Sequence, residues 1–178
     1  MNLFLVGMMG SGKTSVGKRL SRRLGYRFLD TDQFIEQTTG TSISEIFRTC
    51  GEAHFRELEA RLAKRLERLD NYVVSTGGGF LTAPGNLERL KAAGVVVFLN
   101  AARADILKRL AHDTKRPKVQ EGDLEGTVDR LLAERMPLYT QAHVTVPTEG
   151  RSPHRVAGEI IRRIGELRGD APAASTAC

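Results

Sequence analysis

The sequence predicts an α/β protein with a parallel sheet between two layers of helices. Short apolar runs rich in β-branched residues alternate with stretches of helical periodicity. The runs are apolar throughout instead of alternating with polar residues, which is typical of strands covered on both faces. The 178 residues are enough for one domain with a sizeable core. We therefore expect a single domain over residues 1–168, with three layers (α/β/α) around a five-stranded parallel sheet.

Five apolar runs are the strand candidates. They span residues 2–7, 26–30, 72–76, 95–100 and 144–146. Each is short enough for a strand and too short for a buried helix.

Helical patterns lie between these strands. An apolar stripe at steps of three and four predicts a long helix over residues 52–69. Ser42 and Glu45 have the spacing of a capping box before it. A proline near the start and a glycine at the end delimit a short helix over residues 84–94. Further helices are expected over residues 13–24, 104–110, 124–135 and 153–167.

Two segments lack this periodicity. Residues 111–123 are polar and charged, and we expect a mobile lid there. Residues 169–178 are small and include a proline, which predicts a disordered tail.

The composition indicates the class of protein and its cellular location more clearly than its function. The net charge of +6 and the pI of about 9.7 favour an anionic partner, although an ordinary basic surface fits equally well. Cys50 and Cys178 form neither a metal-binding spacing nor a disulfide framework, which suits the cytoplasm. No stretch approaches the roughly 18 apolar residues of a membrane span, and the apolar run at residues 3–6 is too short for a signal peptide. We expect a cytoplasmic protein without membrane contact.

The firmest functional signal is "GMMGSGKT", from Gly7 to Thr14. It fits G-x-x-x-x-G-K-[ST] at every fixed position, with a predicted strand before it and a helix after it. Such a loop turns its N–H groups toward phosphates, while Lys13 reaches the β- and γ-phosphates and Thr14 ligates Mg²⁺. The nucleotide-binding candidates are Gly10, Ser11, Gly12, Lys13, Thr14 and Ser15. A guanine-binding N-K-x-D motif is absent, which argues against a GTPase.

Two acids close the second strand candidate, where ligands of open parallel sheets bind. Asp30 and Asp32 fit a division of work, in which one holds Mg²⁺ through water and the other accepts a proton from an acceptor hydroxyl. The alternative is a polar loop whose first acid caps the next helix. The residues alone leave both interpretations open.

Glycines and arginines supply further candidates. Gly77, Gly78 and Gly79 end the third strand candidate, where they allow either close approach of a ligand or a tight turn. Arg56 and Arg135 fit bidentate binding of a carboxylate, but either also fits a solvated surface charge. Arg116, in the polar segment, suits a lid that closes over phosphates or is ordinary loop charge.

Together these segments resemble one family, shikimate kinase, whose members are P-loop small-molecule kinases with a nucleoside monophosphate kinase-like fold. The resemblance rests on "GMMGSGKT", "FLDTD" followed by "IE", "GEAHFRELE", "TGGG", "KRP" and "RMPLY", in that order. It covers residues 2–167. It implies ATP-dependent phosphorylation of the shikimate 3-hydroxyl, with Mg²⁺, to give shikimate 3-phosphate and ADP on the route to chorismate and aromatic amino acids.

The resemblance also implies residue roles. Asp32 would hold shikimate hydroxyls and act as the base, within a shikimate-binding region at about residues 32–60. Asp30 would support Mg²⁺ through water. Arg56 and Arg135 would clamp the carboxylate. The three glycines at 77–79 would pack against the ring.

On the nucleotide side, Lys13 and Arg116 would act on the phosphates, the latter from the lid. Arg109, Arg151 and Pro153 would lie near the adenine. The family further implies a monomer acting on a small molecule and not on nucleic acid.

Three rival functions share the phosphate-binding loop. A gluconate-type or nucleoside monophosphate kinase would lack the pairing of Asp32 with Arg56 and Arg135. A nucleic-acid-binding ATPase would need surface aromatics, but aromatic residues are only 6% of the chain. An intact Lys13, Thr14 and Asp32 argue against a non-catalytic regulator. The basic stretch at residues 61–68 and the histidines receive no role.

Overall fold

The computed structural model describes residues 1–111 and 123–169. Its centre is a parallel sheet of five strands in the order β2-β3-β1-β4-β5. The strands are β1 (Asn2–Val6), β2 (Arg27–Asp30), β3 (Tyr72–Ser75), β4 (Gly94–Asn100) and β5 (Val144–Pro147). The predicted five-stranded parallel sheet is therefore confirmed, with small differences at the strand ends.

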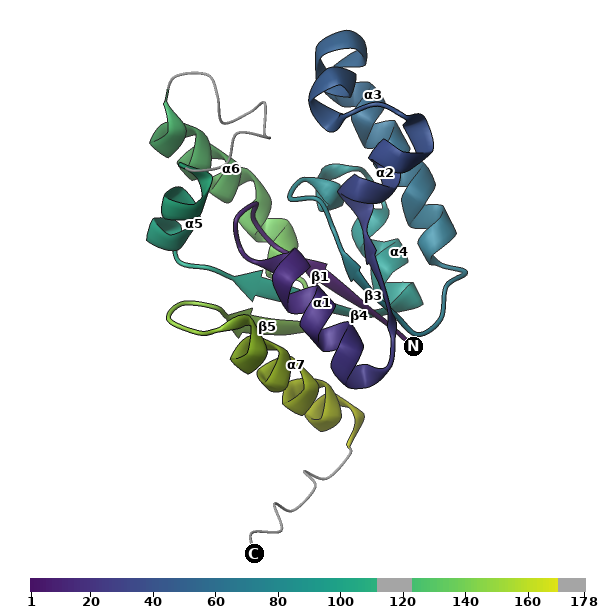
Figure 1. Cartoon of the computed structure of the whole chain (residues 1–178), viewed down its shortest axis with the longest axis vertical. Helices are drawn as coiled ribbons and strands as arrows, with labels where there is room; N and C mark the ends of the chain where they lie inside the picture. Colours follow the sequence, from purple (N-terminus) through teal and green to yellow (C-terminus); the bar gives the residue numbers. More distant parts are fainter. Residues whose placement is uncertain (112–122, 170–178) are drawn as a thin grey trace, which may run out of the picture.

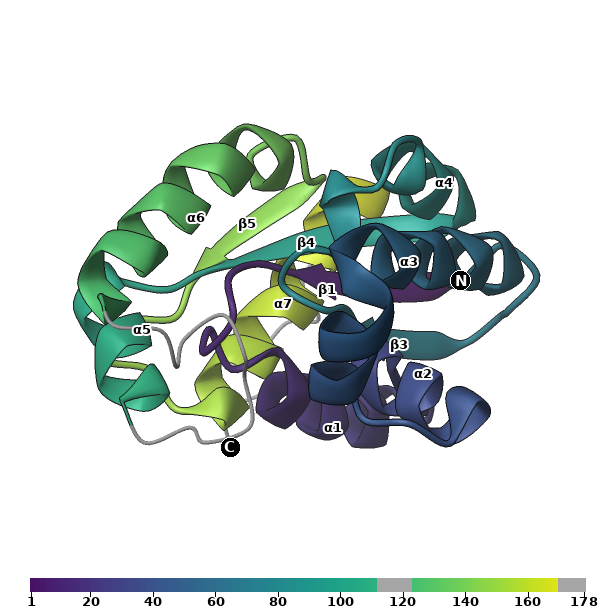
Figure 2. The same cartoon turned by 90° about the horizontal axis from the view of Figure 1, so that it is seen from above.

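The sheet lies between two layers of helices, as Figures 1 and 2 show. The helices are α1 (Lys13–Leu24), α2 (Thr31–Thr39), α3 (Ile43–Leu66), α4 (Asn86–Ala93), α5 (Arg103–Leu110), α6 (Leu124–Tyr139) and α7 (Pro153–Arg168), with a 3-10 turn η1 at Phe80–Thr82. Helix α2 and the turn η1 were not predicted. The predicted lid falls on residues 112–122 and the predicted tail on residues 170–178, both outside the described residues.

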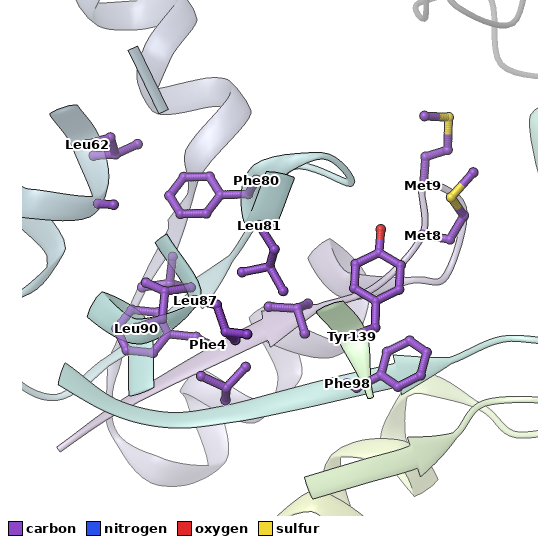
Figure 3. Packing of buried hydrophobic residues seen from close by; sticks show 14 of the residues in the cluster. Phe4, Met8, Met9, Leu62, Phe80, Leu81, Leu87, Leu90, Phe98 and Tyr139 are labelled. Atoms are coloured by element: carbon purple, nitrogen blue, oxygen red, sulfur yellow. The ribbon is translucent and has the colours of Figure 1, made fainter. Parts of the chain in front are cut away.

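Two hydrophobic clusters hold the layers together, one on each face of the sheet. Alternate residues of β1 serve the two faces: Phe4 belongs to the cluster that includes α3, α4 and α6, and Leu3 and Leu5 belong to the cluster that includes α1 and α7. Figure 3 shows part of the first cluster. Because the inner strands β1, β3 and β4 are largely buried on both sides, their apolar runs carry no alternation.

Helix α3 is bent. Ser42 caps its start, since the side-chain oxygen accepts a hydrogen bond from the amide of Glu45, as the capping box predicts. Gly51, at φ 79° and ψ 171°, interrupts the helical backbone between an outer part and a longer inner part. The inner part carries Arg56 and Glu59 toward the end of the sheet.

Helix α6 extends further than predicted. The expected end at residue 135 was wrong, because the helix passes through Pro137 and ends at Tyr139. A proline removes only one amide donor here, and Thr140 bonds back to the carbonyl of Met136 through its amide and its hydroxyl. The additional turn buries Tyr139 in the core. Within the described ranges, no helix has the length and apolar character needed to cross a membrane.

Candidate active site

A cavity of about 490 Å³ opens at the carboxyl end of the sheet. The loop after β1 forms one wall, together with Arg109 of α5. Helices α2 and α3, the glycines after β3 and Arg135 of α6 form the opposite wall. The cavity therefore has a phosphate-binding side and a side that carries both acids and arginines.

The phosphate-binding side is built around the start of α1. Gly10 and Gly12 have φ values of 76° and 91°, in the left-handed region that favours glycine, and they curl the loop in front of the helix. Lys13 is the first residue of α1, and its Nζ donates to the carbonyls of Gly7 and Met8 at 2.8 Å each. The loop thus presents a helix N-terminus and an ammonium group to the cavity. Thr14 and Ser15 also line it, whereas Ser11 is buried behind it.

Asp30 lines the cavity and also caps helix α2. Its Oδ2 accepts a hydrogen bond from Thr14 Oγ1 at 2.8 Å. Its Oδ1 accepts from the amides of Asp32 and Gln33 and so caps α2. Ser75, its register partner on β3, places its hydroxyl 3.4 Å from that of Thr14. Asp30 therefore caps α2, which is the alternative that the sequence left open. It also forms a cluster of oxygen atoms with Thr14 and Ser75, and oxygen is the ligand type that Mg²⁺ prefers.

An acid and arginine cluster forms the other side. Arg56 Nη1 donates to Glu59 Oε2 at 2.5 Å, and Nη2 donates to Glu52 Oε1 at 2.8 Å. Glu59 is fully buried, and burial raises the pKa of its carboxyl to about 7, against the opposing effect of Arg56. Asp32 adds to the increase through its own charge. These groups stand close enough for the protonation of one to depend on the others.

Glu59 was not predicted as a site residue. Its position four residues after the buried Phe55 was the available signal, since residues at that spacing share a helix face. An acid on the apolar face of α3 must find a partner, and here the partner is Arg56.

Arg135 is the most unusual cation of the cavity. Its side chain is 3% exposed, yet its Nε and Nη1 donate to no acceptor in the part of the chain that the structure describes. Buried guanidinium groups are normally paired, because an unused charged donor is costly away from water. The arrangement calls for an anion with two acceptor atoms, such as a carboxylate.

The three glycines after β3 pass beneath these side chains. A Cβ on Gly77 would lie 2.5 Å from Asp32 Oδ1, and a Cβ on Gly79 would overlap the guanidinium of Arg56. The amide of Gly77 is fixed by donation to Thr31 Oγ1 at 2.8 Å. A Cβ at Gly77 or Gly79 would therefore force the side chain of Asp32 or Arg56 to move.

The other nucleotide-side candidates differ in placement. Arg109 Nη1 donates to the Gly10 carbonyl at 2.6 Å, and Arg109 lines the cavity. Arg151 and Pro153 do not line it, and Arg116 falls outside the described residues. His143 accepts a hydrogen bond from the Val96 amide, an interaction within the fold.

The chain is also similar to known proteins in sequence and in structure. Residues 9–165 match the model of the shikimate kinase family. The chain is 44% identical to a shikimate kinase of Synechococcus sp. (strain CC9902), over 93% of this chain and 87% of that one. It is 46% identical to one of Halorhodospira halophila, over 91% and 92% respectively. The solved shikimate kinase of Acinetobacter baumannii in complex with shikimate superposes with a TM-score of 0.91 at 38% identity, covering 96% of this chain and 95% of that one.

Proposed function

Since this chain belongs to the shikimate kinase family, we propose which of its side chains perform the family's reaction. The reaction transfers the γ-phosphoryl group of ATP to the 3-hydroxyl of shikimate and releases ADP. The main support for these roles is that Arg135 lines the cavity with a buried guanidinium whose Nε and Nη1 have no acceptor among the described residues. The shikimate carboxylate supplies the anion that this guanidinium requires.

On the donor side, Lys13 and the loop amides hold the phosphates of ATP. The ammonium bonds to the carbonyls of Gly7 and Met8, and the phosphates would offer it stronger, charged acceptors. The hydroxyl of Thr14 and the carboxylate of Asp30 are hard oxygen donors that suit Mg²⁺, with Asp30 acting through water. A bound Mg²⁺ supplies charge neutralisation on the phosphates.

On the acceptor side, Arg56 and Arg135 clamp the carboxylate and fix one orientation of the ring against Gly77, Gly78 and Gly79. Asp32 then holds the hydroxyls and takes the proton of the 3-hydroxyl as that oxygen attacks the γ-phosphorus. Glu59 holds Arg56 in place through a charged hydrogen bond. In-line placement and charge stabilisation account for the catalysis, since phosphoryl transfer asks for little covalent chemistry from the protein.

Three further roles follow from the family resemblance. Arg116 acts on the phosphates from a lid at about residues 111–123, which excludes water when both substrates are bound. Arg109 contacts the nucleotide, and Arg151 and Pro153 complete the adenine side. The protein acts as a cytoplasmic monomer on a small molecule, without nucleic acid or membrane.

Coupled measurement of ADP release tests the proposal. Shikimate, quinate, gluconate and nucleoside monophosphates are offered in parallel at equal concentration with ATP and Mg²⁺. We expect turnover that depends on shikimate and is much weaker with the other acceptors. Equal turnover with gluconate or a nucleoside monophosphate, or none with shikimate, would contradict it.

A further inference from the structure

The carbonyl of Gly78 has a dedicated partner in the core. Tyr139, the last residue of α6, donates its hydroxyl hydrogen to this carbonyl at 2.5 Å. The side chain of Tyr139 is 1% exposed, so the bond is shielded from water. Helix α6 thereby fixes the middle of the glycine turn.

The ring of Tyr139 is itself anchored. It stacks on Phe98 of β4 with ring centroids 5.1 Å apart and an angle of 22° between the planes. Figure 3 shows the hydroxyl oxygen pointing away from Phe98. Burial raises the pKa of the hydroxyl to about 12, so the group keeps its proton and remains a donor at neutral pH.

Gly78 lies between the two halves of the cavity. A Cβ at this position would lie 3.1 Å from the amide nitrogen of Met9, in the phosphate-binding loop. The same atom would lie 3.3 Å from Nη1 of Arg135. A small rotation of the Gly78 peptide therefore changes the surroundings of Arg135 directly.

Tyr139 and Arg135 are two possible donors to the carbonyl of Gly78. Arg135 has unused N–H groups close to Gly78, and a backbone carbonyl is a good acceptor for a guanidinium. If the carbonyl lacked the tyrosine hydroxyl, the unused donors of this guanidinium would be available to it. The tyrosine hydroxyl satisfies the carbonyl. Arg135 also interacts with this hydroxyl, and its Nε and Nη1 remain available to a ligand.

We propose that Tyr139 is a positioning residue for shikimate binding, which holds the Gly78 carbonyl so that the donors of Arg135 stay open to the substrate carboxylate. The proposal rests on the proposed function, in which Arg135 binds that carboxylate. Tyr139 itself does not line the cavity. Because Arg135 lies on the acceptor side, the effect should appear mainly in the affinity for shikimate. The affinity for the nucleotide, whose loop approaches Gly78 at Met9, should change little.

The test is titration calorimetry of the full chain and of Tyr139→Phe, with shikimate and with ADP and Mg²⁺. The phenylalanine keeps the ring and removes only the hydroxyl. Because one buried hydrogen bond is lost and one carbonyl then competes for Arg135, we expect shikimate to bind about tenfold more weakly and ADP to stay within about twofold. Unchanged shikimate affinity, or an equal loss for both ligands, would overturn the proposal.

Tyr72→Phe is the matched control. The Tyr72 hydroxyl is an exposed acceptor for Arg27 and lies on β3, away from the cavity lining. The loss of this hydroxyl should leave both affinities unchanged. If the unaltered chain shows no turnover with shikimate, the proposed function fails; if it turns over and Tyr139→Phe binds shikimate normally, only the positioning role fails.

A measurement on the unaltered sequence covers the case in which Tyr139→Phe does not fold. The chain has three tyrosines, so incorporation of 3-fluorotyrosine gives three fluorine NMR signals, assigned with Tyr26→Phe and Tyr72→Phe. We expect shikimate to move the Tyr139 signal, because the carboxylate draws Arg135 away from the hydroxyl on which its charge acts. A fluorine chemical shift of Tyr139 that stays unchanged at saturating shikimate would contradict the proposal.

Discussion

The buried carboxyl of Glu59 gives a prediction about stability and pH. Its Oε2 accepts a hydrogen bond from Arg56, and the charges that face it come from Arg56 on its own helix, Asp32 on α2 and Arg135 on α6. Burial dominates over the arginines and raises its pKa from 4.5 to about 7. We expect Glu59→Gln to remove this titration from the folded state.

The direction and the size of the change in unfolding free energy follow from the raised pKa of Glu59. Between pH 4.5 and about 7 the folded chain holds a proton on Glu59 that the unfolded chain has lost. Since the folded state binds more protons there, the free energy of unfolding falls as the pH rises through this window. A shift from 4.5 to about 7 corresponds to a loss of about 3 kcal/mol across the window.

Urea unfolding from pH 5 to pH 8 measures this loss. We expect the unfolding free energy of the unaltered chain, relative to that of Glu59→Gln, to fall by about 3 kcal/mol over this range. Glu57→Gln is the control, because Glu57 lies on the same helix with its side chain 64% exposed. A difference between the chain and Glu59→Gln that stays constant with pH would show that Glu59 does not titrate with a raised pKa in the folded state.

Three substitutions test the acceptor side by steady-state kinetics. Arg135→Ala should raise the KM for shikimate by about 10- to 100-fold and leave the KM for ATP unchanged, since charged hydrogen bonds contribute about 1.5–3 kcal/mol; an unchanged KM for shikimate would exclude the clamp. Asp32→Asn should lower kcat by about 100- to 10,000-fold with a smaller change in KM, the range of general base catalysis; a kcat within threefold of the original, roughly 0.7 kcal/mol, would exclude a base. Gly79→Ala should raise the KM for shikimate about tenfold, because its Cβ displaces Arg56; normal kinetics would show that Arg56 is not needed where it lies.

Much of the fold was predictable because its inner strands, β1, β3 and β4, are largely buried on both faces. That burial leaves continuous apolar runs, which are visible without any partner. Helix α2 was missed because it buries only Thr31 and Ile35, too few residues for an apolar stripe. The end of α6 was misplaced because a proline usually ends a helix, whereas here the burial of Tyr139 favours the additional turn. The strand order depends on pairings between distant segments, which no local pattern contains.

The site was predictable where a residue type or spacing is itself informative. The phosphate-binding loop is an example, since each fixed position has a physical task. Glu57 and Glu59 show the limit: they are two residues apart in "RELE", one largely exposed and the other fully buried. Two residues along a helix turn the side chain to the opposite side, so identity alone cannot distinguish them. Nothing in "RMPLY" distinguishes its tyrosine from an ordinary core aromatic, because its hydroxyl donates to the carbonyl of Gly78 in a distant part of the chain.

The identity of the product tests most directly whether the chain phosphorylates the 3-hydroxyl of shikimate. The chain is incubated with ATP, Mg²⁺ and shikimate, and the products are followed by phosphorus and proton NMR. We expect one phosphate ester, with its phosphorus coupled to the proton on carbon 3 of shikimate, formed in equal amount with ADP. Phosphorus on another hydroxyl, or release of inorganic phosphate with shikimate unchanged, would contradict it.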